Sequence, residues 1–439
     1  MTSPTAVSMP LGKALPIEGS ERLPLLDALR GFALLGVFVT NVSVWFSGRA
    51  LLPRAELEAA IANASLLDVV TMRAMSLLVA GKFLTIFSFL FGLGFAVQLG
   101  RAEQRGASIV PLYARRLGVL LVIALSHLFL LWYGDVLTAY SVLGFGLLLF
   151  RNRSDKVLLS WVPFFIFVVP LTSMFLLRLP ELLGSPEAAA AAAKAAQEHA
   201  EALKAQLLEA STRGSHLDVI SANASFYLGD FMQALLPTNL ALLGRFLLGL
   251  LAGRLMLFHE PAQHLPLLRK VLLWGLVAGA FGSSVAVVLQ VFFLRVVPDP
   301  ESLPWIPFVR FVARQFAEIG IAAIYVTGFT LLFQRPAWRR LLSVFSPVGR
   351  MALTNYLLQT VFSLLCFYGY GLGLMGKLSP SEIMAIPLGL FVLQIVWSQL
   401  WLARFRFGPV EWVWRSLTYG TAQPMRRAPS KPMGAVTLE

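Results

Sequence analysis

A histidine and several ionisable side chains inside apolar runs are the residues of this 439-residue sequence that could do chemistry. A charged group at membrane depth costs several kcal/mol unless it is paired or hydrated, so each such residue is a candidate functional group. His127 lies within an apolar run, where a neutral imidazole can act as a general base or acid near physiological pH. The alternative is a histidine that packs between helices and is hydrogen-bonded to a neighbour.

The first apolar run begins with a possible ion pair between Asp27 and Arg30, which are one helical turn apart. This pair could simply be interfacial, with Arg30 reaching toward the lipid headgroups. Alternatively, the guanidinium of Arg30 could bind a phosphate or a thioester carbonyl. Asn41 lies eleven residues further on, about 16 Å deeper on nearly the same helix face. His127 follows Arg116 by the same number of residues, which predicts a similar depth.

Further polar groups fall in later apolar runs. Arg314 and Glu318 are spaced i, i+4 on a predicted helix and could neutralise each other. Arg245 and Asn355 are also predicted inside spans, where hydrogen bonds between helices would explain them equally well. Together with Tyr356, Gln359, Gln394 and Ser398 these residues predict a hydrated interior cavity. Arg245, Arg314, Glu318 and Asn355 are candidates for substrate binding.

The sequence contains no cluster of residues with metal-ligand spacing. Its single cysteine, Cys366, excludes a disulfide framework and any cysteine-based zinc or iron–sulfur site. The five histidines show no spacing typical of a metal site. We therefore predict no bound metal and no bound cofactor.

Composition places these residues in a membrane protein. The chain is 57% hydrophobic and 13% charged, with a mean hydropathy of +0.73, whereas soluble domains average about 25% charged residues. The net charge of +13 would suggest nucleic-acid binding in a soluble protein. Here the basic residues lie in short gaps between apolar runs, as the positive-inside rule predicts, which argues against a nucleic-acid partner.

Ten apolar runs approach the length of about 20 residues that a spanning helix needs. They centre on residues 25–46, 82–99, 117–133, 136–150, 157–179, 237–258, 270–297, 308–333, 351–372 and 382–403. The charge of the intervening gaps alternates in sign apart from one neutral gap, so ten spans with both termini cytoplasmic is the consistent topology. We predict an all-α, polytopic transmembrane helix bundle in the lipid bilayer of the bacterial inner membrane.

The predicted spans divide into two halves separated by an insertion. Residues 1–180 would form an N-terminal five-span half, and residues 237–427 a C-terminal five-span half with a basic, amphipathic tail. Residues 181–236 would form an extracytoplasmic insertion. Within it, residues 186–213 predict an Ala-rich helix that serves as a solvated spacer, and residues 217–236 predict a helix in the outer interface.

Short motifs spread along the chain resemble those of a known family. One stretch reads Leu26-Asp27-Ala28-Leu29-Arg30-Gly31, and others cover residues 82–94, 115–135, 349–356, 407–412 and 417–420. These motifs resemble the YeiB-like family of polytopic bacterial membrane proteins, whose C-terminal half is classed as domain of unknown function 418. The resemblance covers nearly the whole chain outside residues 181–236.

That family is grouped with membrane acyltransferases of the acyltransferase-3 and heparan-glucosaminide N-acetyltransferase type. The resemblance implies transfer of an acyl group from cytoplasmic acetyl-CoA, or another acyl-CoA, to a small-molecule or glycan acceptor reached from the outer side. In acyltransferase-3 proteins a histidine follows the arginine after ten intervening residues, and here that position is Asn41. An amide cannot be a general base, so His127, with Asp135, would have to supply the base.

Two hypotheses for function follow. In a membrane acyltransferase, Arg30, Arg115 and Arg116 would bind the phosphates of a CoA-type donor, and Asn41 would stabilise the oxyanion. His127 would deprotonate the acceptor.

The alternative is a transporter or lipid-handling or solute-handling protein without acyl-transfer chemistry. In that protein Arg245, Arg314 and Glu318 would bind the translocated polar solute.

Overall fold

Apolar helices build the computed structural model, which describes residues 23–289, 303 and 305–427. Within those residues every regular element is a helix, and the only β contact is an isolated bridge between Phe405 and Arg426. Among the described residues, eight helical stretches are long and apolar enough to cross a membrane, and two shorter apolar helices accompany them. The ten fall on the ten predicted spans, which confirms an all-α polytopic helix bundle and makes the chain a multi-pass membrane protein.

The helices of the first part of the chain run in the following order. They are α1 (Pro24–Thr40), the π-helical turn η2 (Asn41–Phe46), α2 (Arg54–Ala62), α3 (Leu66–Ala74), η3 (Met75–Val79), α4 (Lys82–Gln104), α5 (Val110–Leu130), α6 (Leu137–Phe150), α7 (Asp155–Pro163), η4 (Phe164–Val168) and α8 (Val169–Leu183).

The second part of the chain begins with a long polar helix and ends with a short amphipathic one. Its elements are α9 (Pro186–Arg213), α10 (His216–Phe226), η5 (Tyr227–Phe231), α11 (Met232–Arg254), η6 (Pro261–His264), α12 (Leu265–Val288), α14 (Ile306–Phe333), α15 (Pro336–Leu342), η9 (Ser343–Phe345), α16 (Ser346–Arg350), α17 (Ala352–Phe367), α18 (Pro380–Arg404) and α19 (Pro409–Tyr419).

Several predicted spans differ at their ends from the observed helices. The third, predicted over 117–133, is α5, which begins seven residues earlier at Val110 and ends at Leu130. The ninth, predicted over 351–372, ends at Phe367 because Tyr368 is extended (ψ 154°) and the glycines that follow adopt turns. The sixth, predicted over 237–258, begins at Met232 and continues without a break from α10 through η5. The seventh, predicted over 270–297, is α12 up to Val288, and the rest of it lies outside the described residues.

Residues 217–236, predicted as a helix in the outer interface, form α10, η5 and the start of α11. Val219, Phe226 and Phe231 of this segment are buried in the protein. Phe226 and Phe231 pack edge-on against Tyr133, with ring centroids 5.0 and 5.1 Å apart. This packing closes the end of the bundle above the loop between α5 and α6.

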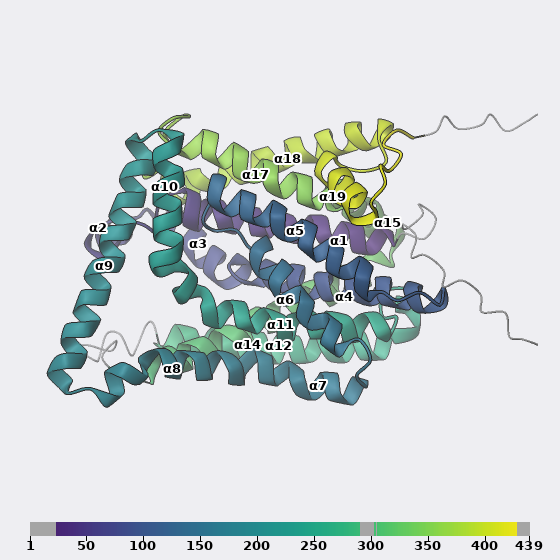
Figure 1. Ribbon diagram of the computed structural model, residues 1–439, viewed down its shortest axis with the longest axis horizontal. Helices are drawn as coiled ribbons and strands as arrows, with labels where there is room; N and C mark the ends of the chain where they lie inside the picture. Colours follow the sequence, from purple (N-terminus) through teal and green to yellow (C-terminus); the bar gives the residue numbers. More distant parts are fainter. Residues whose placement is uncertain (1–22, 290–302, 304, 428–439) are drawn as a thin grey trace, which may run out of the picture.

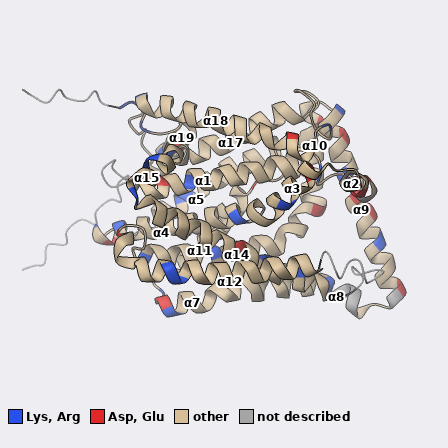
Figure 2. Ribbon diagram, turned by 180° about the vertical axis from the view of Figure 1, so that it is seen from behind, with Lys and Arg blue, Asp and Glu red and all other residues tan. Residues whose placement is uncertain are grey.

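The apolar helices lie side by side around α1, which is the most buried of the spans, whereas α12 lies at the periphery. In Figure 1, α9 crosses the end of the bundle opposite α19. Lys and Arg gather at the α15–α19 end, whereas α9 carries both signs of charge (Figure 2). The basic end is the one predicted to be cytoplasmic, and the sidedness itself stays a prediction.

Glycines allow α1 to approach α16 backbone to backbone. A Cβ added at Gly349 would overlap the carbonyl oxygen of Asp27 and lie 2.7 Å from the Gly31 nitrogen. A Cβ added at Gly31 would overlap the carbonyl oxygen of Phe345. Arg30 directly precedes Gly31, and Arg350 directly follows Gly349. The contact between the glycines therefore also brings the backbones of these two arginines together.

Candidate functional site

An interior cavity of about 290 Å³ opens among the helix ends at the basic end of the bundle. Its walls come from α1, α4, α5, α6, α16, α17 and α19, which are distant in sequence. Leu23, Arg101, Trp414 and Arg415 line its outer part, and Tyr140 and Tyr356 lie among its deeper residues. The volume is at the low end of the ~300–1,000 Å³ typical of small-molecule sites.

Arginines dominate the charge on the cavity wall. Five line it, namely Arg30, Arg101, Arg116, Arg350 and Arg415, against the two carboxylates Asp27 and Glu411. Arginine guanidinium groups bind phosphate oxygens with paired hydrogen bonds, and clustered arginines are typical of phosphate recognition. The wall between them is largely apolar, so the cavity suits a ligand with an anionic head and an apolar or weakly polar arm.

The predicted ion pair of the first span lies in this wall. Arg30 Nη1 donates to Asp27 Oδ1 at 3.1 Å, and the Arg30 side chain keeps 33% of its surface exposed. Part of the guanidinium therefore remains available to a ligand. Arg116 stacks over the Trp414 ring at 4.0 Å, and Trp414 Nε1 donates to the Arg116 carbonyl at 2.9 Å, which fixes α19 against α5.

Glu411 joins α19 to the start of α17. Its Oε1 accepts hydrogen bonds from Leu353 N at 2.7 Å and Thr354 N at 3.0 Å, two amides that have no partner within the first turn of a helix. Burial raises the pKa of the Glu411 carboxyl, and the hydrogen bonds from Thr354 oppose that rise. The contact lets a short amphipathic helix form one side of the cavity.

His127 takes part in a buried chain of three side chains. Its Nδ1 lies 2.8 Å from Asp135 Oδ1, and its Nε2 lies 2.9 Å from Thr360 Oγ1. The imidazole and carboxylate are almost completely buried, with 1% and 0% of their side-chain surfaces exposed. Asp135 also accepts from the amide and hydroxyl of Thr138, at 2.7 and 2.8 Å, so its carboxylate has donors on both oxygens.

Tyr356 separates this chain from the cavity. Its ring lines the cavity and lies 5.3 Å from the His127 ring between centroids. Thr360 follows Tyr356 by one helical turn on α17 and therefore lies on the same side of that helix. The Asp135–His127–Thr360 chain thus lies directly behind the cavity wall.

Three predicted site residues lie outside the cavity wall and also outside the two buried polar clusters around His127 and Arg245. Asn41 is half-buried at the start of the π-helical turn η2 and does not line it. Arg115 is exposed and also outside it. Asn355 joins α17 to α18, donating to Ser398 Oγ at 3.0 Å, so helix packing explains its position. The structure therefore does not bring Arg30, Asn41 and His127 together in this cavity: Arg30 faces it, His127 lies behind its wall, and Asn41 contributes to neither.

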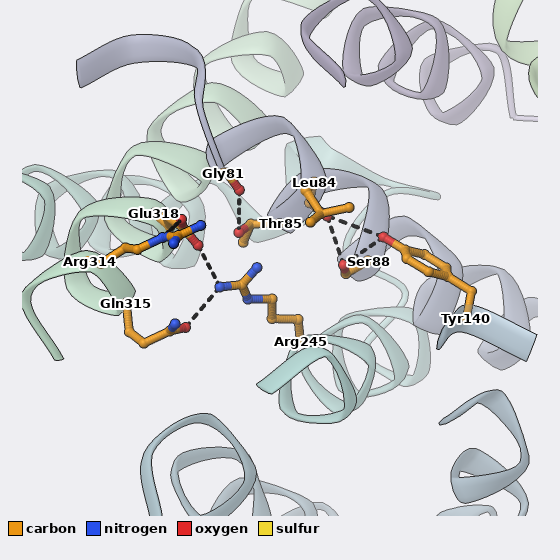
Figure 3. Close-up of polar contacts among 9 residues, drawn as sticks. All are labelled: Gly81, Leu84, Thr85, Ser88, Tyr140, Arg245, Arg314, Gln315 and Glu318. Atoms are coloured by element: carbon orange, nitrogen blue, oxygen red, sulfur yellow. Dashed lines mark hydrogen bonds and ion pairs between the residues drawn. The ribbon is translucent and has the colours of Figure 1, made fainter. Parts of the chain in front are cut away.

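A second polar cluster forms between α11 and α14, as Figure 3 shows. Arg245 Nη2 donates to Glu318 Oε2 at 2.7 Å and to Gln315 Oε1 at 2.8 Å, and Arg314 Nε donates to Glu318 Oε1 at 2.6 Å. Arg245 is buried, yet its Nε and Nη1 have no hydrogen-bond partner. Buried donors of this kind are normally satisfied by water or a ligand.

The cluster lies close to the wall of the cavity. Gly81 makes room for the Glu318 carboxylate, which a Cβ at that position would overlap. About two turns further along, Ser88 Oγ of α4 lies 2.7 Å from the hydroxyl of Tyr140, which lines the cavity (Figure 3). Polar groups therefore continue from the cavity wall toward Arg245.

Sequence reasoning missed several residues of the site. Arg350, Tyr356 and Glu411 carry a signal, since they fall in the motifs at 349–356 and 407–412. Trp414 lies two residues beyond the second motif. Thr360 carries no signal, because an isolated hydroxyl in an apolar helix usually bonds its own backbone.

Comparison with known proteins identifies relatives over nearly the full chain. Residues 252–421 match the family model described as "Protein of unknown function (DUF418)". The chain is 35% identical to the uncharacterized protein YxaH of Bacillus subtilis (strain 168), over 94% of this chain and 98% of the relative. It is 30% identical to the uncharacterized protein YeiB of Escherichia coli (strain K12), over 92% and 98%. No solved structure matches.

Proposed function

We propose that this chain, which belongs to the DUF418 family of proteins of unknown function, is a membrane-embedded acyltransferase that uses a CoA-type donor. Membership of the family bears out the resemblance of the motifs to YeiB-like proteins, and the link to acyltransferases is part of the proposal. The observation that carries it is the arginine-lined cavity whose wall, at Tyr356, contacts the His127 ring of an Asp–His–Thr chain.

The donor would bind with its phosphates among the arginines at the mouth of the cavity. Arg30, Arg116 and Arg350 come from α1, α5 and α16, so they can contact a branched, multiply charged head from different sides. The cavity is too small for a whole CoA molecule and suits its pantetheine arm, which would extend along the apolar wall toward Tyr356. In the predicted orientation the head would remain on the cytoplasmic side of the bacterial inner membrane.

His127 would act as the general base. Asp135 accepts from Nδ1, which leaves the Nε2 lone pair to take a proton from a hydroxyl. Asn41, proposed from the sequence to hold the acyl oxygen, is left out of this mechanism because it lies away from both the cavity and His127. The acceptor would be a hydroxyl or amine of a small molecule or glycan.

Donor binding is tested by thermal unfolding of the purified protein in detergent with and without acetyl-CoA. A ligand at one hundred times its Kd stabilises the folded state by about 2.7 kcal/mol, so the melting temperature should rise with donor concentration. Arg116→Gln should weaken this response, whereas Arg115→Gln should not, because Arg115 is exposed and outside the cavity. Equal effects of the two neighbours would count against the cavity as the donor site.

Chemistry is tested by release of the CoA thiol and formation of acylated acceptor. His127→Gln should abolish transfer while the response of the melting temperature to acetyl-CoA remains. His264→Gln serves as the matched control, since His264 belongs to η6 and lies away from the site. Transfer at the wild-type rate in His127→Gln would refute the proposed mechanism.

Transport remains the second candidate because of one observation, the unpartnered donors of Arg245 in a cluster with two other charged side chains. Such donors suit the carboxylate or phosphate of a translocated solute. The two functions can be distinguished in detergent solution, because transport requires two compartments and acyl transfer does not. An acyltransferase releases CoA thiol there, and a transporter does not.

A further inference from the structure

We propose that Thr360 is the nucleophile of the reaction and carries the acyl group as an ester between two half-reactions. This inference rests on the proposed function, and it adds a covalent intermediate and a residue that the sequence does not single out. It stands on the direction of the Thr360 hydroxyl, on the hydrogen bonds of Asp135, and on the place of both behind the cavity wall.

The hydroxyl of Thr360 is directed differently from those of three other buried threonines in the spans. Thr85, Thr327 and Thr330 each donate to the backbone carbonyl four residues earlier, at 2.9, 2.6 and 2.7 Å. This is the ordinary way for a threonine to satisfy its hydroxyl in an apolar helix. Thr360 Oγ1 instead lies 2.9 Å from His127 Nε2, across 233 residues of sequence.

The donors around Asp135 decide which partner gives the proton in this hydrogen bond. The Asp135 carboxylate accepts from the Thr138 amide and hydroxyl on Oδ2 and faces His127 on Oδ1. An ionised carboxylate only accepts, so His127 Nδ1 must carry the hydrogen. In the neutral imidazole Nε2 is then the acceptor, and the Thr360 O–H donates to it. This is the acid–histidine–hydroxyl arrangement that activates serine nucleophiles on unrelated folds.

Access to Thr360 passes by Tyr356. The step of four residues from Tyr356 to Thr360 on α17 corresponds to a rise of about 6 Å. Tyr356 lines the cavity, and its ring lies 5.3 Å from the imidazole between centroids. The phenol accepts only a long hydrogen bond, 3.5 Å from Val136 N. Rotation of this one side chain would open the cavity toward the Thr360 hydroxyl.

The chemistry balances without a further reactant. Thr360 Oγ1 attacks the thioester carbonyl carbon as its proton passes to His127 Nε2. The tetrahedral intermediate collapses, the carbon–sulfur bond breaks, and the thiolate takes the proton from His127 to leave as CoA thiol. In the second half, an acceptor hydroxyl or amine gives its proton to His127 and attacks the Thr360 ester. The threonine oxygen leaves and recovers that proton.

The test is to incubate the purified full chain with radiolabelled acetyl-CoA in the absence of acceptor and to locate the label by peptide mass spectrometry. We expect a burst of about one thiol per chain and a label on the α17 peptide that contains Thr360. Thr360→Ser should retain the label on the substituted hydroxyl, and Thr360→Val should lose it. Thr330→Val, a buried threonine of α14 that bonds its own helix, is the matched control and should be labelled like the wild type.

Each outcome decides between the inference and the function on which it rests. Acetyl-CoA must raise the melting temperature of Thr360→Val and Thr330→Val equally, which shows that both fold and bind donor. Multiple turnovers by Thr360→Val, or turnover by the wild type without a labelled Thr360, would overturn the covalent intermediate and leave acyl transfer standing. A wild-type protein that neither binds acetyl-CoA nor releases thiol would overturn both.

Discussion

A single methyl group added at Gly349 tests whether the contact between α1 and α16 holds the cavity together. In Gly349→Ala the new carbon would lie 2.7 Å from the Gly31 nitrogen and would overlap the Asp27 carbonyl oxygen. Ordinary contacts begin at 3.4 Å, so the helices must separate by at least about 0.7 Å along this direction, because backbone atoms cannot rotate aside as a side chain can. Overpacking of this kind typically costs about 1–3 kcal/mol.

Gly328→Ala is the matched control for this substitution. Gly328 lies inside α14, and a Cβ there would meet nothing within 4 Å. Alanine in an open helical position is favoured over glycine by up to about 1 kcal/mol. The two single-methyl variants should therefore differ in free energy of unfolding by about 1–4 kcal/mol. Thermal unfolding in one detergent measures the difference, and equal melting temperatures would refute the packing argument.

Gly349→Ala should also affect the ligand. Asp27 and Arg30 on α1 and Arg350 on α16 line the same cavity, so a shift between the two helices moves these charged groups relative to one another. We expect a weaker response of the melting temperature to acetyl-CoA than in Gly328→Ala. An unchanged response in a destabilised variant would mean that the arginines act independently of this contact.

Three further predictions follow from single contacts. Arg245→Met should lower the free energy of unfolding by about 3–5 kcal/mol because it leaves buried Glu318 with one partner fewer. In thermal unfolding, the double variant Arg245→Met with Glu318→Gln should recover part of the lost stability. Tyr356→Ala should expose His127, whose side chain is 1% exposed in the wild type. Diethyl pyrocarbonate should therefore modify this histidine faster in the variant, and mass spectrometry measures the rate. Glu411→Gln should cost about 1–3 kcal/mol and make the α19 segment more sensitive to protease, since the carboxylate holds the first amides of α17.

Hydropathy and charge predicted the bundle because a spanning segment in lipid must hydrogen-bond its own backbone N–H and C=O groups, whatever its neighbours are. The ends of the helices were less predictable. Residues 217–236 mix Asp218, Asn223 and Asp230 with apolar residues, a pattern typical of an interface helix. The structure shows them continuous with α11. Phe226 and Phe231 pack against Tyr133, a partner that the local sequence does not reveal. A place of this segment in the outer interface stays a prediction.

The candidate site was predictable only in parts that are local in sequence. Asp27 with Arg30, and Arg314 with Glu318, are pairs within one helix, and the structure contains both. The partner that gives His127 its possible chemistry is Thr360, on a helix 233 residues away, and no spacing rule connects them. Asn41 was chosen by depth along one helix, and depth alone does not specify which neighbours a side chain meets.

The place of α19 in the chain has a consequence for biosynthesis. This helix follows all ten apolar helices in sequence, and it supplies Glu411, Trp414 and Arg415 to one side of the cavity. A nascent chain with its spans already inserted would still lack that side, so no ligand could be captured before the ribosome has translated residue 415. Competence to bind would then arise in one late step, after membrane insertion, when α19 folds back onto α5 and α17.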